Sequence, residues 1–448
     1  MDIIGLISGF GNIFWVVIAF VVALSVIVAI HEYGHYIVGR WSGIGADVFS
    51  IGFGPVLWSR YDKRGTKWQI AAFPLGGYVK FKGDANAASG KDDEAMSDLT
   101  DEERRHTMHG APLWARTATV AAGPIFNFIL SIIVFAAVFL TRGEVGDTFK
   151  VGELRDLPPP AYTLQADDEI RAIGGLTVPS FGDAEGFSAF ATDLPIAAPL
   201  EYEVIRDGQN ARVTGPYLYP PIVLHLAPQS AAYNIGMEVG DVITAIDERP
   251  ILAFSELKEA VETGEGRALS LTVWRGGEEI DFTLVPRRVD EPQPGGGFET
   301  NWRIGIGGGL AFDPATETPG VGSAVWGGVV QTGRIIEGSI SGLYHMVTGA
   351  ISTCNLSGPV GIAQTSGAMA SQGAMSFIWF IAVLSAAIGM LNLFPIPMLD
   401  GGHLVFYAYE AVAGRPPSDG VVRVLMTMGL VIVLSMMAFG LTNDLFCP

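Results

Sequence analysis

Long apolar runs divide this chain, and their length is the first clue to its structure. Residues 13–30 read IFWVVIAFVVALSVIVAI, in which Ser25 is the only polar side chain. Eighteen helical residues and the turn that follows reach about 30 Å, the thickness of a bilayer core. Runs of comparable length recur three more times. The pattern predicts four transmembrane helices, within the segments 1–40, 113–141, 375–412 and 420–441.

A signal peptide is the alternative interpretation of the first run. It would need a basic region before the apolar run and a cleavage site of small residues after it. Residues 1–12 contain no Lys or Arg, and the polar sequence HEYGH follows the run directly. The sequence therefore favours a retained transmembrane helix.

The loop at 41–112 contains two runs typical of β-strands, at 46–60 and 66–81, which flank the turn sequence YDKRG. We expect a β-hairpin here. Glycines such as Gly52 and Gly54 would let a second backbone come close to it. An ordinary cytoplasmic hairpin, to which no second backbone binds, is the alternative.

A tandem repeat occupies the long segment between the second and third runs. LQADDEIRAIGGLTV (164–178) aligns with MEVGDVITAIDERPI (237–251), and a strand with a hairpin turn follows in each copy. The two copies begin 73 residues apart, at 164 and 237. A spacing of this size indicates two small domains, not a solenoid. We expect α/β domains at 149–217 and 218–289, with paired spacers that bind no ligand as the alternative. The Gly-rich stretch 290–322 indicates a linker.

Positive charge sets the expected orientation. The loop after the first apolar run carries ten Lys and Arg residues, from Arg40 to Arg105, whereas residues 1–12 and the tail LTNDLFCP carry none. Both termini and the repeat are therefore expected outside the cytoplasm. The amphipathic segment 323–374 is expected to lie at the membrane surface.

Composition narrows the classes of function. Charged residues make up 16% of the chain, against roughly 25% in soluble domains. The net charge of −19 argues against a nucleic-acid partner, because phosphate binding needs clustered Lys and Arg. The two cysteines, Cys354 and Cys447, are too few for a disulfide framework or a Cys-based zinc site.

The sequence HEYGH (31–35) carries the candidate chemistry. His31 and His35 are four residues apart, so on a helix they project from one face and can share a metal ion. Glu32 is placed to take a proton from an attacking water. Ionisable groups at membrane depth are costly, and they indicate function. Polar residues where the helix leaves the membrane are the alternative, but these would not explain the spacing.

A catalytic zinc site usually needs a third protein ligand. The sequence NLFPIPMLDGGH (392–403) has two prolines that break a helix within an apolar run, and Asp400 follows them. Irregular backbone at this depth is tolerated where protein or a water-filled cavity meets it. Asp400 is the expected third ligand, and His403 is the rival.

These motifs together resemble those of the site-2 proteases. HEYGH, GPIFN (123–127) and NLFPIPMLDGG match the family's three motifs, and the repeat resembles the tandem PDZ domains of its RseP type. The resemblance implies zinc as cofactor, with His31, His35 and Asp400 as ligands and Glu32 as general base. It also implies that Asn127 and Asn392 hold the substrate backbone, and that the hairpin with Gly52 and Gly54 dips into the membrane and contacts substrate.

The expected fold is a polytopic α-helical membrane protein with four transmembrane helices, a membrane-associated β-hairpin region and two extracytoplasmic PDZ-like α/β domains. The expected function is cleavage of transmembrane helices of single-span proteins in a bacterial inner membrane, in contact with its lipids. The resemblance suggests an anti-sigma factor after a first cut, or signal-peptide remnants, as substrate, and a peptide or chain end as PDZ ligand.

Two other functions are weighed against this one. A non-catalytic PDZ scaffold or chaperone anchored in the membrane would not need Glu32. A transporter with a metal site in its broken helix would call for paired discontinuous segments in two similar halves, and the sequence shows one.

Overall fold

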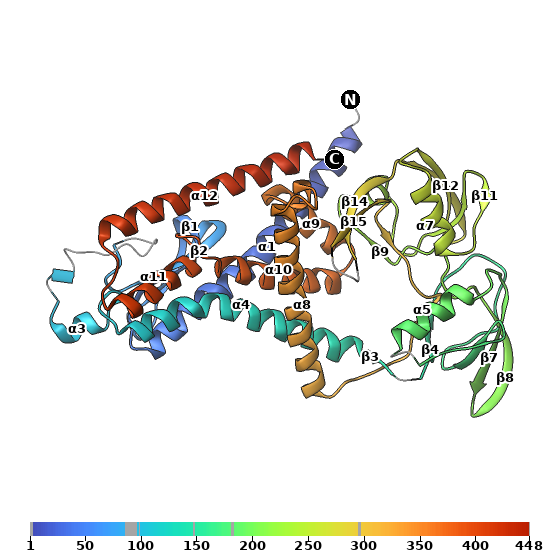
Figure 1. Ribbon diagram of the computed structural model, residues 1–448, viewed down its shortest axis with the longest axis horizontal. Coiled ribbons are helices and arrows are strands. Elements are labelled where there is room, and N and C mark those ends of the chain that lie inside the picture. Colours follow the sequence, from blue (N-terminus) through green and yellow to red (C-terminus); the bar gives the residue numbers. More distant parts are fainter. Residues whose placement is uncertain are drawn as a thin grey trace. The chain divides into compact units, whose positions relative to one another are not determined.

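The computed structural model describes residues 3–85, 96–97, 99–146, 148–180, 183–293 and 297–447 (Figure 1). Parts of the expected segments 1–40, 41–112, 149–217 and 290–322 lie outside these ranges. The chain forms two compact units: Met1–Val138 with Val321–Pro448, and Phe139–Gly320. Each is described separately below.

The first unit is mainly helical. Four helices of the described chain are long and apolar enough to cross a membrane, which confirms the number expected from the sequence: Ile13–Trp41, Leu113–Arg142, Ala374–Asn392 and Asp419–Phe446. The first of these is part of α1. The helices of the unit are α1 (Ile3–Trp41), α3 (Asp101–Arg105), α4 (Leu113–Arg142), α8 (Val321–Val347), the 3-10 turn η1 (Thr353–Asn355), α9 (Pro359–Ser371), α10 (Ala374–Asn392), α11 (Asp400–Ala413) and α12 (Asp419–Phe446).

A curled antiparallel sheet follows α1, as the strand patterns predict. It is built from β1 (Ala46–Tyr61) and β2 (Lys67–Phe81). Val48 pairs with both Lys80 and Lys67, so the two long strands fold back on each other. Tyr36 of α1 donates a hydrogen bond to Asp62 in the connecting turn (3.0 Å), which ties the sheet to the helix that carries HEYGH.

The predicted helix break separates α10 from α11. The backbone bends between Leu393 and Leu399, and Met398 has φ 122°. At Gly402 a Cβ would lie 2.5 Å from the carbonyl oxygen of Ile396, and at Gly429 of α12 a Cβ would lie 1.9 Å from that of Pro397. Glycine is therefore required where these backbones meet.

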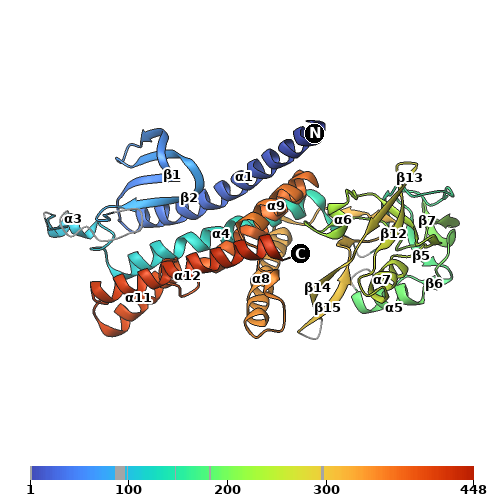
Figure 2. The same cartoon turned by 90° about the horizontal axis from the view of Figure 1, so that it is seen from above.

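The segment expected at the membrane surface forms α8, η1 and α9. In both views α8 runs across the direction of α4 and α12 (Figures 1 and 2). It meets α4 through a hydrogen bond between the hydroxyls of Thr332 and Ser131 (3.1 Å) and packs Gly328 against the backbone of Ile132.

The end of α12 is fastened to this segment by contacts that the sequence analysis did not predict. Cys447 forms a disulfide with Cys354. Asp444 accepts hydrogen bonds from the backbone N–H groups of Gly358 and Val360 at the start of α9 (2.8 and 3.0 Å). Two cysteines far apart in sequence gave no signal for this pairing.

The second unit confirms the repeat. Its two four-stranded sheets have the orders β6-β5-β7-β8 and β11-β10-β12-β13, so corresponding strands occupy corresponding places. Each copy has one helix of ten residues and its own apolar core. The strands and helices of the two copies are β3 (Glu144–Val145), β4 (Val151–Leu154), β5 (Glu169–Ile173), β6 (Leu176–Thr177), α5 (Ala184–Asp193), β7 (Leu200–Arg206) and β8 (Gln209–Gly215), then β9 (His225–Leu226), α6 (Ala231–Asn234), β10 (Val242–Ile246), β11 (Arg249–Pro250), α7 (Phe254–Thr263), β12 (Leu269–Arg275) and β13 (Glu278–Leu284).

The prediction of a linker at 290–322 is wrong, because most residues of its described part belong to strands that pair with other strands. It carries β14 (Arg287–Pro292), β15 (Phe298–Arg303), β16 (Ile306–Gly307), β17 (Phe312–Pro314) and β18 (Thr316–Glu317). After the β14–β15 hairpin the chain returns along both copies, and β16 pairs with β9, β17 with β4 and β18 with β3. At Gly308 a Cβ would lie 2.3 Å from the ring of Phe254. The glycines of this run allow the close approach of neighbouring chain segments, so they do not mark a linker here.

A buried ion pair recurs in both copies. Arg206 donates two hydrogen bonds to the carboxylate of Asp168 (2.7 and 2.6 Å), and Arg275 does the same for Asp241 (2.6 and 2.7 Å). Burial alone would raise the pKa of Asp168, but the bonds from Arg206 and from the N–H of Gln165 outweigh it and the pKa is lowered. The pair therefore stabilises the fold above the unfolded-state pKa of about 3.9, and this contribution is lost as the pH falls through the lower folded-state pKa.

Asp168→Asn should destabilise the first copy by about 1–3 kcal/mol at pH 7, because the guanidinium loses a charged acceptor. The measurement is the urea concentration at the midpoint of unfolding of residues 149–217, detected by proteolytic cleavage within this segment of the full-length protein. Asp207→Asn, an exposed position in the same hairpin, is the control. Equal midpoints for both variants would contradict the assigned role, and the difference between them should shrink below pH 4.

Candidate metal centre

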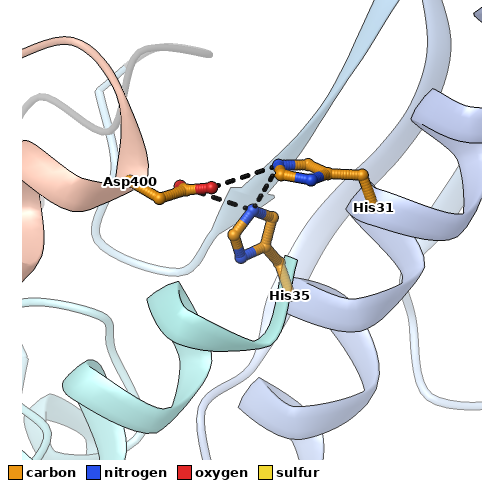
Figure 3. A group of neighbouring side chains, drawn as sticks. All are labelled: His31, His35 and Asp400. Carbon is orange, nitrogen blue, oxygen red and sulfur yellow. Dashed lines mark hydrogen bonds and ion pairs between the residues drawn. The ribbon is translucent and has the colours of Figure 1, made fainter. Parts of the chain in front are cut away.

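Two helices that are distant in sequence supply the three residues of the site. His31 and His35 lie on one face of α1, with ring centroids 4.7 Å apart, and Asp400 is the first residue of α11 (Figure 3). The positive end of the α11 dipole favours a carboxylate at this position. The spacing within HEYGH and the break before Asp400 thus bring the expected ligands together.

The three side chains converge on one point. The Nε2 atoms of His31 and His35 are 3.1 Å apart. Asp400 places Oδ2 3.2 Å from His31 Nε2 and Oδ1 3.5 Å from His35 Nε2 (Figure 3). Ligand atoms around a tetrahedral zinc ion lie about 3.3 Å from one another. In the part of the chain that the structure describes, the buried Oδ2 of Asp400 has this ion-pair contact with His31 and no hydrogen-bond partner, so the site has the donor set and an oxygen suited to a cation.

The other ring nitrogens of the histidines meet α4. Nδ1 of His35 lies 2.9 Å from the carbonyl oxygen of Thr119, and Nδ1 of His31 lies 3.2 Å from the side-chain amide of Asn127. A backbone carbonyl on Nδ1 leaves the Nε2 lone pair available to a metal. Both histidines are therefore held on the side away from Asp400.

Glu32 faces the sheet. Its carboxyl group accepts a hydrogen bond from the backbone of Val79, and it lies within electrostatic reach of both histidines and Asp400. A Cβ at Gly77 of β2 would lie 3.2 Å from Glu32 Cγ. The part of β2 that contains Gly77 therefore lies beside the Glu32 side chain.

The remaining expected residues have different surroundings. Gly52 and Gly54 have positive φ values (91° and 86°) and pack within the sheet against Ala71 and Phe73, whereas Gly77 of the same sheet lies beside Glu32. Asn392 is the half-buried last residue of α10. Among the described residues His403 is outside the group of possible metal ligands, which consists of His31, His35 and Asp400.

Sequence reasoning missed the roles of Thr119 and Gly123, two residues of α4 that shape the site. Together with Asn127 they follow one another at four-residue intervals and share a helix face. At Gly123 a Cβ would lie 2.3 Å from Nε2 of His35 and 2.8 Å from Cε1 of His31. The four-residue interval matches that of the histidines and could have identified this face.

Comparison with known proteins decides the family. A family model described as Peptidase family M50 matches residues 19–436. The chain belongs to peptidase family M50. A protein of Agrobacterium fabrum named as a zinc metalloprotease is 36% identical over 437 residues, covering 96% of this chain and 95% of the relative. The Regulator of sigma-E protease RseP of Escherichia coli is 31% identical over 461 residues, covering 96% and 98%.

These matches confirm the recognised family and the expected enzyme class, a membrane metalloprotease. A similarly named protein of Rhizobium meliloti is 35% identical over 435 residues, covering 97% of each chain. Zinc, the cofactor expected from HEYGH, agrees with the names of these relatives and with the donor set formed by His31, His35 and Asp400.

Gly123→Ala should lower the affinity for zinc by about 10–100-fold, because the methyl group would occupy the space of the two imidazole rings. The measurement is zinc retained by the purified protein in a chelator titration. Gly338→Ala is the control, since a Cβ at that helical position meets nothing within 4 Å. Unchanged zinc retention in Gly123→Ala would show that the rings have room to move.

Proposed function

We propose that this protein is a zinc-dependent intramembrane protease that cleaves the transmembrane segment of single-span membrane proteins. The convergence of His31, His35 and Asp400 from two apolar regions, with Glu32 beside them, carries the proposal. A non-catalytic scaffold would need neither the metal ligands nor a general base.

The division of work among the residues follows from their positions. Bound zinc supplies a Lewis acid that polarises a carbonyl and brings the pKa of water to about 7. His31, His35 and Asp400 hold the metal. Glu32 accepts the proton of the attacking water and passes it to the leaving amine.

A substrate helix must unwind before it is cut, and its freed backbone groups then need partners. We propose that the unwound segment adds as a strand to the β1–β2 sheet near Gly77, the point at which β2 meets Glu32. Gly52 and Gly54 would then act by shaping the curl of the sheet. The amide of Asn392 offers both a donor and an acceptor to the same strand.

The proposed topology places both termini and the second unit in the periplasm of a bacterial inner membrane. The Lys and Arg residues of the loop at 41–112 support the orientation. The disulfide between Cys354 and Cys447 adds independent support, because disulfides persist in oxidising compartments. In this topology the end of α12 and the η1 segment lie outside the cytoplasm.

The relatives named Regulator of sigma-E protease suggest a substrate class. We propose single-span regulators, such as an anti-sigma factor already shortened outside the membrane, as substrates, in a stress response. Signal-peptide remnants are the alternative. We also propose that the two outside copies are PDZ domains that bind chain ends by strand addition, which their shared sheet order supports.

Glu32→Gln should lower the cleavage rate by 10²-fold or more, on the order typical of a lost general base, while zinc stays bound. The assay follows a purified model transmembrane substrate, together with zinc content. Asp400→Ala is the comparison, and it should lose zinc as well as activity. A fully active Glu32→Gln variant would contradict the mechanism and leave the scaffold or chaperone role as the better explanation.

Removing the second unit should relax substrate selection and leave zinc binding intact. The strand pair of Val145 and Thr316 brings the ends of the unit together, so a junction of Gly143 to Thr318 deletes it without cutting either copy. The measurement compares cleavage of full-length and pre-trimmed substrate by the intact and the shortened enzyme. The expected result rests on the proposal that the second unit excludes substrates whose outside domain has not been removed. A shortened enzyme that still rejects the full-length substrate would contradict this role, and loss of activity on both substrates would assign substrate positioning to the unit.

A further inference from the structure

Asn127 has the environment of a residue that orients a metal ligand. Its side chain is fully buried on α4, with Nδ2 3.2 Å from His31 Nδ1. Its Oδ1 is buried and has no hydrogen-bond partner in the described chain. An unpaired buried oxygen is destabilising, so its position beside His31 needs an explanation.

The contact between the amide and the ring can be made in two ways. If Nδ2 donates to Nδ1, the proton of a neutral His31 must sit on Nε2, and that nitrogen then cannot bind a metal. If the amide is turned by half a rotation, Oδ1 accepts from Nδ1–H and the Nε2 lone pair faces Asp400 and His35. The second arrangement gives Oδ1 a partner, moves Nδ2 into the place that the unpaired oxygen occupied, and makes His31 a ligand.

The neighbouring histidine shows the same arrangement. Nδ1 of His35 lies 2.9 Å from the carbonyl oxygen of Thr119, two turns before Asn127 on the same face of α4. The position of Asn127 is itself fixed, because Ser385 of α10 donates a hydrogen bond to its backbone oxygen (2.9 Å) and Gly389 leaves room for its Cβ. One face of α4 therefore places an oxygen-bearing group beside each histidine, the backbone carbonyl of Thr119 and the side-chain amide of Asn127.

We propose that Asn127 is a positioning residue for the metal: its Oδ1 accepts the Nδ1–H of His31, which sets the tautomer and ring orientation that zinc binding requires. This rests on the proposed function of the site. It replaces the substrate-holding role that the family resemblance implied for Asn127, and it leaves that role to Asn392 alone.

The test measures zinc affinity of the full-length protein in detergent by chelator competition, together with the visible absorption of the cobalt-substituted protein. Asn127→Leu keeps the size of the side chain and removes the acceptor, so zinc should bind about 10–100-fold more weakly. Asn127→Asp keeps an acceptor and should restore the affinity and the cobalt spectrum. Asn392→Leu, the matched control, should bind zinc as the wild type does and raise the KM for a transmembrane substrate.

The outcomes separate this inference from the proposed function. Wild-type zinc affinity and cobalt spectrum in Asn127→Leu, with a raised KM, would overturn the inference and restore the substrate-holding role. If Asn127→Leu does not fold, Asn127→Asp decides: weak zinc binding in a folded Asp variant would overturn the inference. A wild-type protein that binds no zinc would instead overturn the proposed function.

Discussion

The structure depends on one constraint: a polar or titratable group among apolar helices must have a partner. Water is scarce at membrane depth, and each unsatisfied group costs several kcal/mol. His31 and His35 meet this constraint on both ring nitrogens, with α4 on one side and Asp400 on the other. A metal ion satisfies the inner atoms of all three side chains together.

The constraint also accounts for the irregular backbone of the first unit. In a continuous helix through 374–413, the regular turns would fix the position and direction of the Asp400 side chain. The break between α10 and α11 allows this side chain to point toward α1. Glycines at the break let the freed carbonyl groups lie against neighbouring helices. Further along, the ion pair between Arg116 of α4 and Glu410 (2.6 and 3.0 Å) fixes the helix that begins at Asp400. The same break and the same ion pair thus position Asp400 for the metal site and satisfy polar groups among the apolar helices.

Much of this arrangement could be predicted from local patterns. The length of the apolar runs predicted four spans, the interval in HEYGH placed two histidines on one helix face, and the prolines after Asn392 indicated the break. The repeat at 149–289 was visible because equivalent turns recur at a fixed spacing. Each of these features can be predicted from a short stretch of neighbouring residues.

The rest depends on long-range packing, which short windows do not record. The Gly-rich stretch after Arg303 looked like a linker, because glycine marks both a flexible chain and a close approach of two backbones. The disulfide of Cys354 joins residues 93 apart. The role of Gly123 is to leave space for His35, which lies far away in the sequence. The residues next to Gly123 in the sequence do not show that a side chain packs there.

X-ray absorption at the zinc edge tests the central claim most directly, because it counts the ligands of the metal itself. Purified full-length protein loaded with one zinc per chain should show nitrogen and oxygen neighbours at about 2.0–2.1 Å, with the multiple scattering of two imidazole rings. His31→Ala should remove one imidazole contribution. A spectrum with a sulfur neighbour, or one that His31→Ala leaves unchanged, would contradict a site built from His31, His35 and Asp400.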